Sequence, residues 1–116
     1  MNQKDDKAFL INQYIANEAS IDLAYMVANC LEDKTLLGNN SYRYLLDLAT
    51  VYLRYYLMCY GQALSTQMSE NALRVHSESI LRKLLESGST DRGTLLFSLY
   101  DLTKEEIANI GASNAR

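Results

Sequence analysis

Proline is absent from this chain of 116 residues, where an average usage of about 5% would give roughly six. Proline is the residue that breaks helices most strongly, because it lacks a backbone N–H and its ring clashes with the preceding turn. Glycine is also scarce, with only five residues. Both scarcities favour long, uninterrupted helices.

Basic residues are too few and too scattered to form a surface that coats nucleic acid. Eleven Lys and Arg against fourteen Asp and Glu give a formal net charge of −3. Electrostatic contacts with phosphates supply essentially all non-specific nucleic-acid binding. The composition therefore disfavours DNA or RNA as a partner.

The chain has only two cysteines, Cys30 and Cys59, and both lie in apolar runs. We expect buried free thiols, because a zinc site needs four ligands at short spacing and a disulfide needs an oxidising compartment. The N-terminal MNQKDDK is polar, unlike a signal peptide, and no run of about 18 residues is free of charge. These features predict a cytoplasmic protein with no membrane partner, no metal and no cofactor.

The length is typical of one domain, and residues 1–116 are predicted to form a single helical domain with a frayed tail at 111–116. The first helix is expected at about residues 5–31. Ser20 could cap a second helix, so a break near residues 17–20 is an alternative. Apolar side chains recur along this helix in a heptad-like seam with one polar member: Leu10, Tyr14, Asn17, Ile21, Ala24, Ala28 and Leu31.

Tyrosine is concentrated in residues 41–64, which hold six of the nine tyrosines. Ser41 is the expected N-cap of this helix, after a turn that contains Gly38. On a helical wheel, its polar side chains fall on one narrow stripe: Arg43, Asp47, Thr50 and Arg54. A helix that is apolar over the rest of its circumference must be covered on most sides. It is expected to be the central helix of a bundle or to share a face with another chain.

The third helix is expected between a cap at Ser69 and a C-terminal glycine at Gly88. Its polar residues alternate in sign at four-residue steps, which is typical of a solvent-exposed face: Glu70, Arg74, Glu78, Arg82 and Glu86. Its expected buried face comprises Leu73, Ile80, Leu81, Leu84 and Leu85.

The C-terminal part is expected to form two short helices. Ser89 or Thr90 can cap the first. Thr103 and Glu106 have the T-x-x-E spacing of a capping box, which predicts the start of the second, and Gly111 would end it.

Residues 102–113, LTKEEIANIGAS, resemble the first helix and turn of helix-turn-helix regulators such as the Crp-type winged-helix family. The resemblance covers about a tenth of the chain and implies DNA binding by a following recognition helix. Two departures are present: two residues rather than three separate Ala108 from Gly111, and three residues follow Ser113.

The sequence contains one histidine, His76, on the apolar stripe of the third helix. A catalytic histidine needs a positioned partner within hydrogen-bond reach, and the nearby Glu78 points elsewhere on a helix. No phosphate loop and no Glu-x-x-His metal pattern is present. We therefore predict no catalytic residues and no enzyme activity.

These observations predict an all-α fold, a compact bundle of four to five helices with a tyrosine-rich central helix. The predicted function is non-catalytic: a small adaptor, inhibitor or immunity-type regulator that binds a protein partner, forming a homodimer. Tyrosine and arginine are frequent anchors of interfaces, so the predicted partner-binding residues are Tyr44, Arg43, Arg54 and Tyr55. Two alternatives remain: a dimeric transcriptional regulator with a degenerate C-terminal helix-turn-helix, and a helical ligand-binding protein or enzyme using His76.

Overall fold

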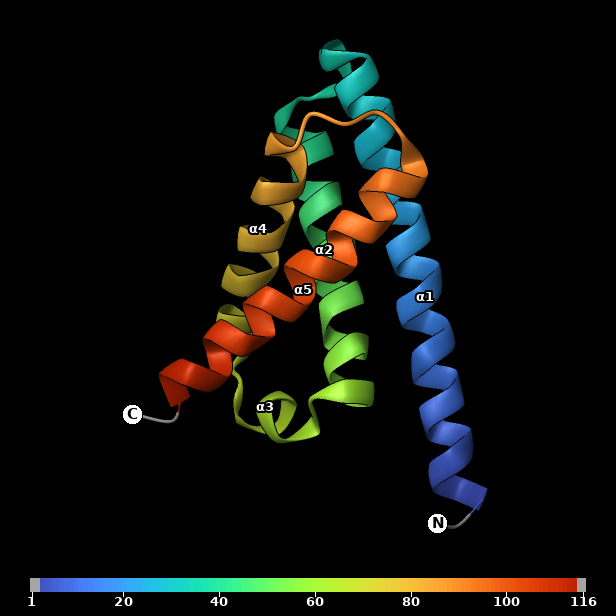
Figure 1. Ribbon diagram of the computed structural model, residues 1–116, viewed down its shortest axis with the longest axis vertical. Coiled ribbons are helices and arrows are strands. Elements are labelled where there is room, and N and C mark those ends of the chain that lie inside the picture. Colours follow the sequence, from blue (N-terminus) through green and yellow to red (C-terminus); the bar gives the residue numbers. More distant parts are fainter. Residues whose placement is uncertain (1–2, 115–116) are drawn as a thin grey trace.

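The computed structural model describes residues 3–114, which form a helical bundle and contain no strand (Figure 1). The all-α bundle of four to five helices is therefore confirmed. Its elements in chain order are α1 (Gln3–Glu32), a 3₁₀ turn η1 (Lys34–Leu36), α2 (Asn39–Tyr60), α3 (Gln62–Gln67), α4 (Glu70–Glu86) and α5 (Arg92–Asn114).

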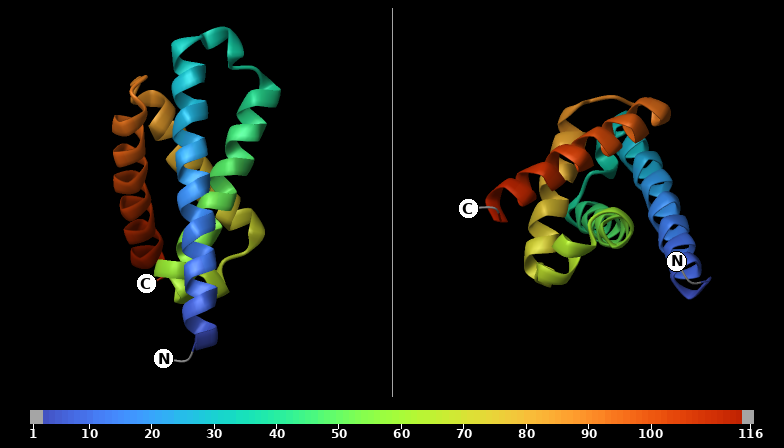
Figure 2. Two further views of the ribbon diagram at one scale, coloured as in Figure 1. Left: turned by 90° about the vertical axis from the view of Figure 1, so that its right-hand side faces the viewer. Right: turned by 60° about the horizontal axis from the view of Figure 1, so that its bottom comes forward.

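The tyrosine-rich helix α2 has a central place, with α1 on one side and α4 on the other. Helix α5 crosses them diagonally and contacts α1 and α4 (Figure 1). In the left view of Figure 2, α5 lies on one side of the α1–α2 pair, and on the opposite side the short α3 region lies beside the C-terminal part of α2 only. The bundle is therefore closed on one face and open on the other.

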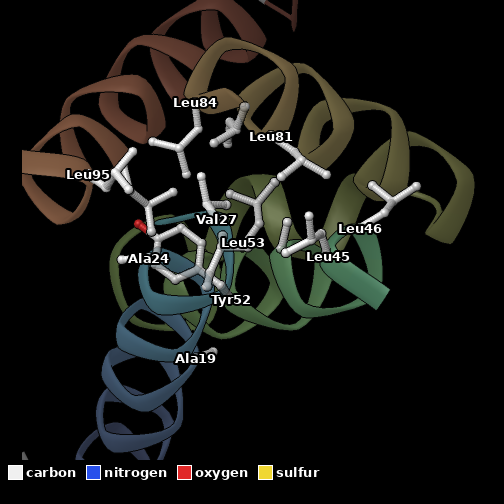
Figure 3. Packing of buried hydrophobic residues seen from close by; sticks show 14 of the residues in the cluster. Ala19, Ala24, Val27, Leu45, Leu46, Tyr52, Leu53, Leu81, Leu84 and Leu95 are labelled. Atoms are coloured by element: carbon white, nitrogen blue, oxygen red, sulfur yellow. The ribbon is translucent and has the colours of Figure 1, made fainter. Parts of the chain in front are cut away.

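The core lies between the four long helices, where leucines of α2, α4 and α5 meet small residues of α1 (Figure 3). Alanines and a valine on α1 allow the other helices to approach closely, and leucines fill the space between them. The side chains with almost no exposed surface include Leu23, Val27, Leu45, Tyr52, Leu53, Leu57, Ile80, Leu81, Leu84, Leu95 and Leu99.

Helix α1 is continuous, so the alternative break near residues 17–20 is wrong. Ser20 is fully buried and satisfies its hydroxyl inside the helix, where Oγ donates to the carbonyl of Asn17 at 2.7 Å. The Tyr100 hydroxyl of α5 lies 3.1 Å from the same Oγ. Ser20 is therefore a buried polar contact between α1 and α5 and caps no helix.

Helix α2 differs from expectation at both ends. It begins at Asn39 with Gly38 as the N-cap, so the predicted cap at Ser41 lies inside the helix and is wrong. It ends at Tyr60, because the backbone leaves the helical conformation at Gly61, with φ −151° and ψ 44°, before α3 begins at Gln62.

Helix α4 has the predicted bounds. The Ser69 hydroxyl accepts from the N–H of Ala72 at 3.1 Å, and Gly88 follows the helix with a φ of +70°. Four of the five predicted core residues are buried, and Leu85 is half-buried against the core.

Helix α5 corrects the prediction of two short C-terminal helices, because it runs without interruption from Arg92 to Asn114. Its first turn is capped by Asp91, whose carboxylate accepts from the N–H of Thr94 at 2.8 Å, and not by Ser89 or Thr90. Thr103 lies in the middle of the helix and is fully buried, so the predicted capping box is wrong.

The helix-turn-helix resemblance also fails, because residues 102–113 lie within α5 and contain no turn. Gly111 lies inside α5 and does not end it. The frayed tail is predicted for residues 111–116; residues 111–114 belong to α5, and residues 115–116 lie outside the described residues.

Cys30 is buried and Cys59 is half-buried, and both are free thiols. Burial raises the pKa of both thiols, which keeps them protonated and unreactive.

Candidate interaction surface and the His76 site

Helix α2 exposes a continuous apolar stripe on the open side of the bundle. Its members follow one another at alternating steps of four and three residues, which places them on one face of a helix. We call this set the outer stripe of α2: Tyr44, Leu48, Val51, Tyr55 and Met58. Tyr44 is 56% exposed and Met58 37%, and the three residues between them are half-buried.

The opposite face of α2 explains why the outer stripe points away from the core. Leu53 has no exposed surface, and Leu57 and Tyr52 retain only 1%. Leu53 lies about 180° from the outer stripe on the helical wheel. Helix α2 is thus apolar on both faces, while the protein's own helices cover only one of them.

The predicted polar stripe of α2 packs against α4. Arg54 forms an ion pair with Glu70, and Asp47 pairs with Arg74 at 2.9 Å. Thr50 between them is buried, and its hydroxyl donates to the carbonyl of Leu46 at 2.7 Å.

The charged face of α4 therefore serves partly as an ion-pair partner of α2. Of the four pairs that its i,i+4 spacing predicts, only Glu78–Arg82 forms, at 2.8 Å. Glu70 and Arg74 pair instead with residues of α2.

The structure does not bring the four predicted partner-binding residues together on one surface. Tyr44 and Tyr55 lie together on the outer stripe. Arg43 is exposed on its flank, three turns from Arg54, whose guanidinium is already held by Glu70.

Sequence reasoning did not name the aliphatic members of the outer stripe as site residues. The signal was present in the four- and three-residue spacing that Leu48, Val51 and Met58 share with the two tyrosines. That spacing identifies a face of the helix, but it does not tell which of two apolar faces points inward.

Three other tyrosines of α2 form a row from the core to the surface: Tyr52 is buried, Tyr56 is half-buried and Tyr60 is exposed. The Tyr52 hydroxyl lies 2.9 Å from Thr103 Oγ1, which supplies the partner that a buried tyrosine needs. The rings of Tyr56 and Tyr60 lie next to it, with centroids 4.8 Å apart and planes tilted by 55°, and Tyr60 meets Phe9 of α1 edge to face. These rings join α1 and α2 and are not part of the outer stripe.

His76 has a carboxylate partner that its neighbours in the sequence do not supply. Its Nδ1 lies 2.7 Å from Oε2 of Glu106, which reaches α4 from α5. The other carboxylate oxygen of Glu106 accepts from the Ser79 hydroxyl at 3.0 Å, and the residue is only 6% exposed. Glu106 lies thirty residues from His76 in the chain, so only the crossing of α5 over α4 reveals the pair.

A pocket of about 220 Å³ opens beside His76. A carboxylate can only accept hydrogen bonds, so the Nδ1 that faces Glu106 carries its proton and Nε2 is the imidazole's free nitrogen. The pocket has a mixed lining of four apolar and three polar side chains: Leu64, Met68, Ala72 and Ile110 with Gln67, Ser69 and His76.

Comparison of the chain with protein-family models, with curated proteins and with solved structures gave no match. Within residues 3–114, no helix is both long enough and apolar enough to cross a membrane. The same described residues contain no group of three or more His, Cys, Asp or Glu that could hold a metal ion.

Proposed function

We propose that this protein acts without catalysis, by binding a protein partner through the outer stripe of α2. The observation that carries the proposal is a five-residue apolar stripe along a central helix, half-buried in its middle and exposed at Tyr44 and Met58. Contiguous apolar surface of this kind marks interaction sites on soluble proteins.

The composition of this surface is that of an interface. Tyr44 and Tyr55 supply large rings with few rotatable bonds, which are the side chains most often found as binding anchors. The exposed Arg43 and the Asp47–Arg74 ion pair lie on one flank and would form a polar rim. Arg54 contributes indirectly, because its ion pair with Glu70 holds α4 beside the stripe.

The role that fits such a surface is that of a small adaptor, inhibitor or immunity-type regulator in the cytoplasm. Each of these roles needs a rigid surface with aromatic anchors and no reaction. A homodimer is part of the same proposal, because a second exposed helical face is available on α1.

The test replaces the two anchors of the outer stripe. A tagged wild-type chain is used to isolate a partner from the native host, and the affinity of the purified partner is then measured. Tyr44→Glu with Tyr55→Glu should weaken binding at least a hundredfold, because two charges would be buried in the interface.

Two controls accompany this experiment. Phe97→Glu places the same charge on the exposed face of α5 and should leave the affinity unchanged. Tyr44→Phe with Tyr55→Phe keeps the rings and should retain most of the binding. An unchanged dissociation constant for the double glutamate variant, with its melting temperature preserved, would refute the proposal.

A second candidate function, binding of a small ligand, is favoured by the His76 pocket. Because Glu106 holds Nδ1 and orients the ring, Nε2 is the ring nitrogen left to hydrogen-bond a ligand, next to the apolar residues of the pocket. The fitting ligand class is a small molecule with a hydroxyl group and an apolar part, because the lining offers both polar and apolar side chains.

Ligand-observed NMR with a library of phenols and aliphatic alcohols tests this candidate. Binders should be lost in His76→Gln and retained in the Tyr44→Glu/Tyr55→Glu variant. If no compound of the library binds in a way that depends on His76, the ligand-binding function is refuted.

A further inference from the structure

Helix α1 carries a second exposed apolar stripe, on the side that faces away from the core. Its large side chains are mostly solvent-accessible: Leu10 is 60% exposed, Tyr14 66%, Ile21 39% and Tyr25 46%. The core-facing residues of α1 lie on the other side of the helix, where Leu23 and Val27 have no exposed surface. We call the four exposed residues the α1 stripe.

The α1 stripe is symmetric along the helix. Leu10 and Tyr25 lie equally far from the midpoint between Asn17 and Glu18, and so do Tyr14 and Ile21. Asn17 and Glu18 are themselves exposed at the centre. A two-fold axis through this midpoint would pair the stripe with a copy of itself, which is the requirement for a symmetric dimer.

We propose that a second copy of this chain packs antiparallel on the α1 stripe. Leu10 then lies against Tyr25 of the partner subunit, and Tyr14 against Ile21 of the partner subunit. All four apolar side chains of each subunit are buried by this one register. The inference rests on the homodimer in the proposed function and assigns its surface to α1 rather than α2.

The polar centre sets the register of the pair. In this arrangement the Asn17 amide faces Glu18 of the partner subunit, and the symmetric contact forms on the other side of the axis. Two amide-to-carboxylate hydrogen bonds then link the polar side chains at the centre of the pair. A polar residue inside an otherwise apolar seam fixes register and orientation in coiled coils.

The surroundings of the α1 stripe leave room for the partner helix. The N-terminal turns of α1 extend beyond the other helices, in views from two sides (Figures 1 and 2). At the other end, the guanidinium of Arg92 lies 4.0 Å from the centroid of the Tyr25 ring and holds that ring in place. The N-terminal end of the α1 stripe is thus accessible to a partner helix, and at the other end the Tyr25 ring is already fixed in one orientation.

The molecular mass of the protein in solution tests whether the α1 stripe is the dimer interface. Light scattering at micromolar concentration should give about twice the chain mass of 13.1 kDa. Tyr14→Glu with Ile21→Glu should halve the measured mass while the circular dichroism spectrum stays helical. Tyr44→Glu with Tyr55→Glu, on the outer stripe of α2, should remain dimeric.

Crosslinking tests the orientation, in a background where Cys30→Ala and Cys59→Ala remove the native thiols. Leu10→Cys chains mixed with Tyr25→Cys chains should form a disulfide-linked heterodimer on mild oxidation. Leu10→Cys chains alone should not crosslink, because the two copies of residue 10 would lie about 22 Å apart at 1.5 Å per residue.

The outcomes separate this inference from the proposed function. A wild-type chain that stays monomeric would overturn the dimer and leave partner binding through α2 untouched. A dimer that survives Tyr14→Glu/Ile21→Glu, or that crosslinks through Leu10→Cys alone, would overturn the antiparallel α1 arrangement. Loss of partner binding only in the α2 variant would leave the α1 dimer intact.

Discussion

Thr103 is the most constrained polar residue of the core, since its single hydroxyl serves two partners. Its Oγ1 donates to the carbonyl of Leu99 at 2.6 Å, so the Tyr52 hydroxyl, 2.9 Å away, must be the donor to Oγ1. Tyr52 therefore depends on Thr103 for its only acceptor, whereas Thr103 keeps a bond without Tyr52. The contact is asymmetric, and mutations should reveal this.

We predict that Thr103→Val costs more than Tyr52→Phe. The valine leaves a buried tyrosine hydroxyl without a partner, which costs about 1–3 kcal/mol, whereas the phenylalanine loses one hydrogen bond worth about 0.5–1.5 kcal/mol. The double variant should be more stable than Thr103→Val alone. Urea unfolding of the four chains measures these differences, and equal losses in the two single variants would contradict the assigned donor.

Alkaline pH should destabilise the fold through the same tyrosine. Burial raises the pKa of Tyr52 well above the value of about 10 that a free tyrosine has. Above pH ~10 the unfolded chain loses this proton while the folded chain keeps it, so stability falls as pH rises. Stability curves at pH 8 to 11 should be flatter for Tyr52→Phe. If the stability of the wild type depends on pH as weakly as that of the variant, Tyr52 is not the cause of alkaline destabilisation.

At the scale of elements, α4 shows how strongly the two sides of one helix differ. Leu84 has no exposed surface and sits where α4 meets α5 (Figure 3), whereas Glu78 contacts only Arg82 at the surface. Leu84→Ala should cost about 2–5 kcal/mol through the cavity that it leaves. Glu78→Ala should cost less than about 1 kcal/mol. A melting temperature of Leu84→Ala within a degree or two of wild type would contradict the assigned face.

Replacing two glycines near the ends of α4 and α5 by alanine should change the stability of the protein in opposite directions. Gly111 lies inside α5 with open space around its Cα, so Gly111→Ala should stabilise the protein by about 0.5–1 kcal/mol. Gly88 has a φ of +70°, where any side chain is strained, so Gly88→Ala should destabilise by about 1 kcal/mol. Thermal unfolding measures both changes. A loss of stability in Gly111→Ala would indicate that α5 ends there.

The whole molecule carries a net charge of −3 and lacks a recognition helix in the described part of α5. Affinity for random duplex DNA should therefore be negligible at about 0.15 M salt, because few phosphate contacts are available. Gel-shift titration up to micromolar protein checks this expectation. A clear shift that Lys104→Ala or Arg116→Ala abolishes would restore the regulator as an alternative.

Local features of the sequence determined much of the architecture. The absence of proline, the three- and four-residue spacing of leucines and the Ser69 cap act between residues that are neighbours on one helix. They can therefore be recognised in the sequence, although the leucine face stabilises its helix only once it is packed. For this reason the helical class, the bounds of α4 and its buried leucines could be predicted without knowledge of the packing.

Only the tertiary structure decided which partner each polar group has and which apolar face points inward. Thr103 and Glu106 have the spacing of a capping box, yet the crossing of α5 over α2 and α4 places them against Tyr52 and His76. In the same way, α2 has two apolar faces, and the packing of α1 and α4 against the other face leaves Tyr44 exposed. These outcomes depend on contacts between residues far apart in the chain, which no local spacing encodes.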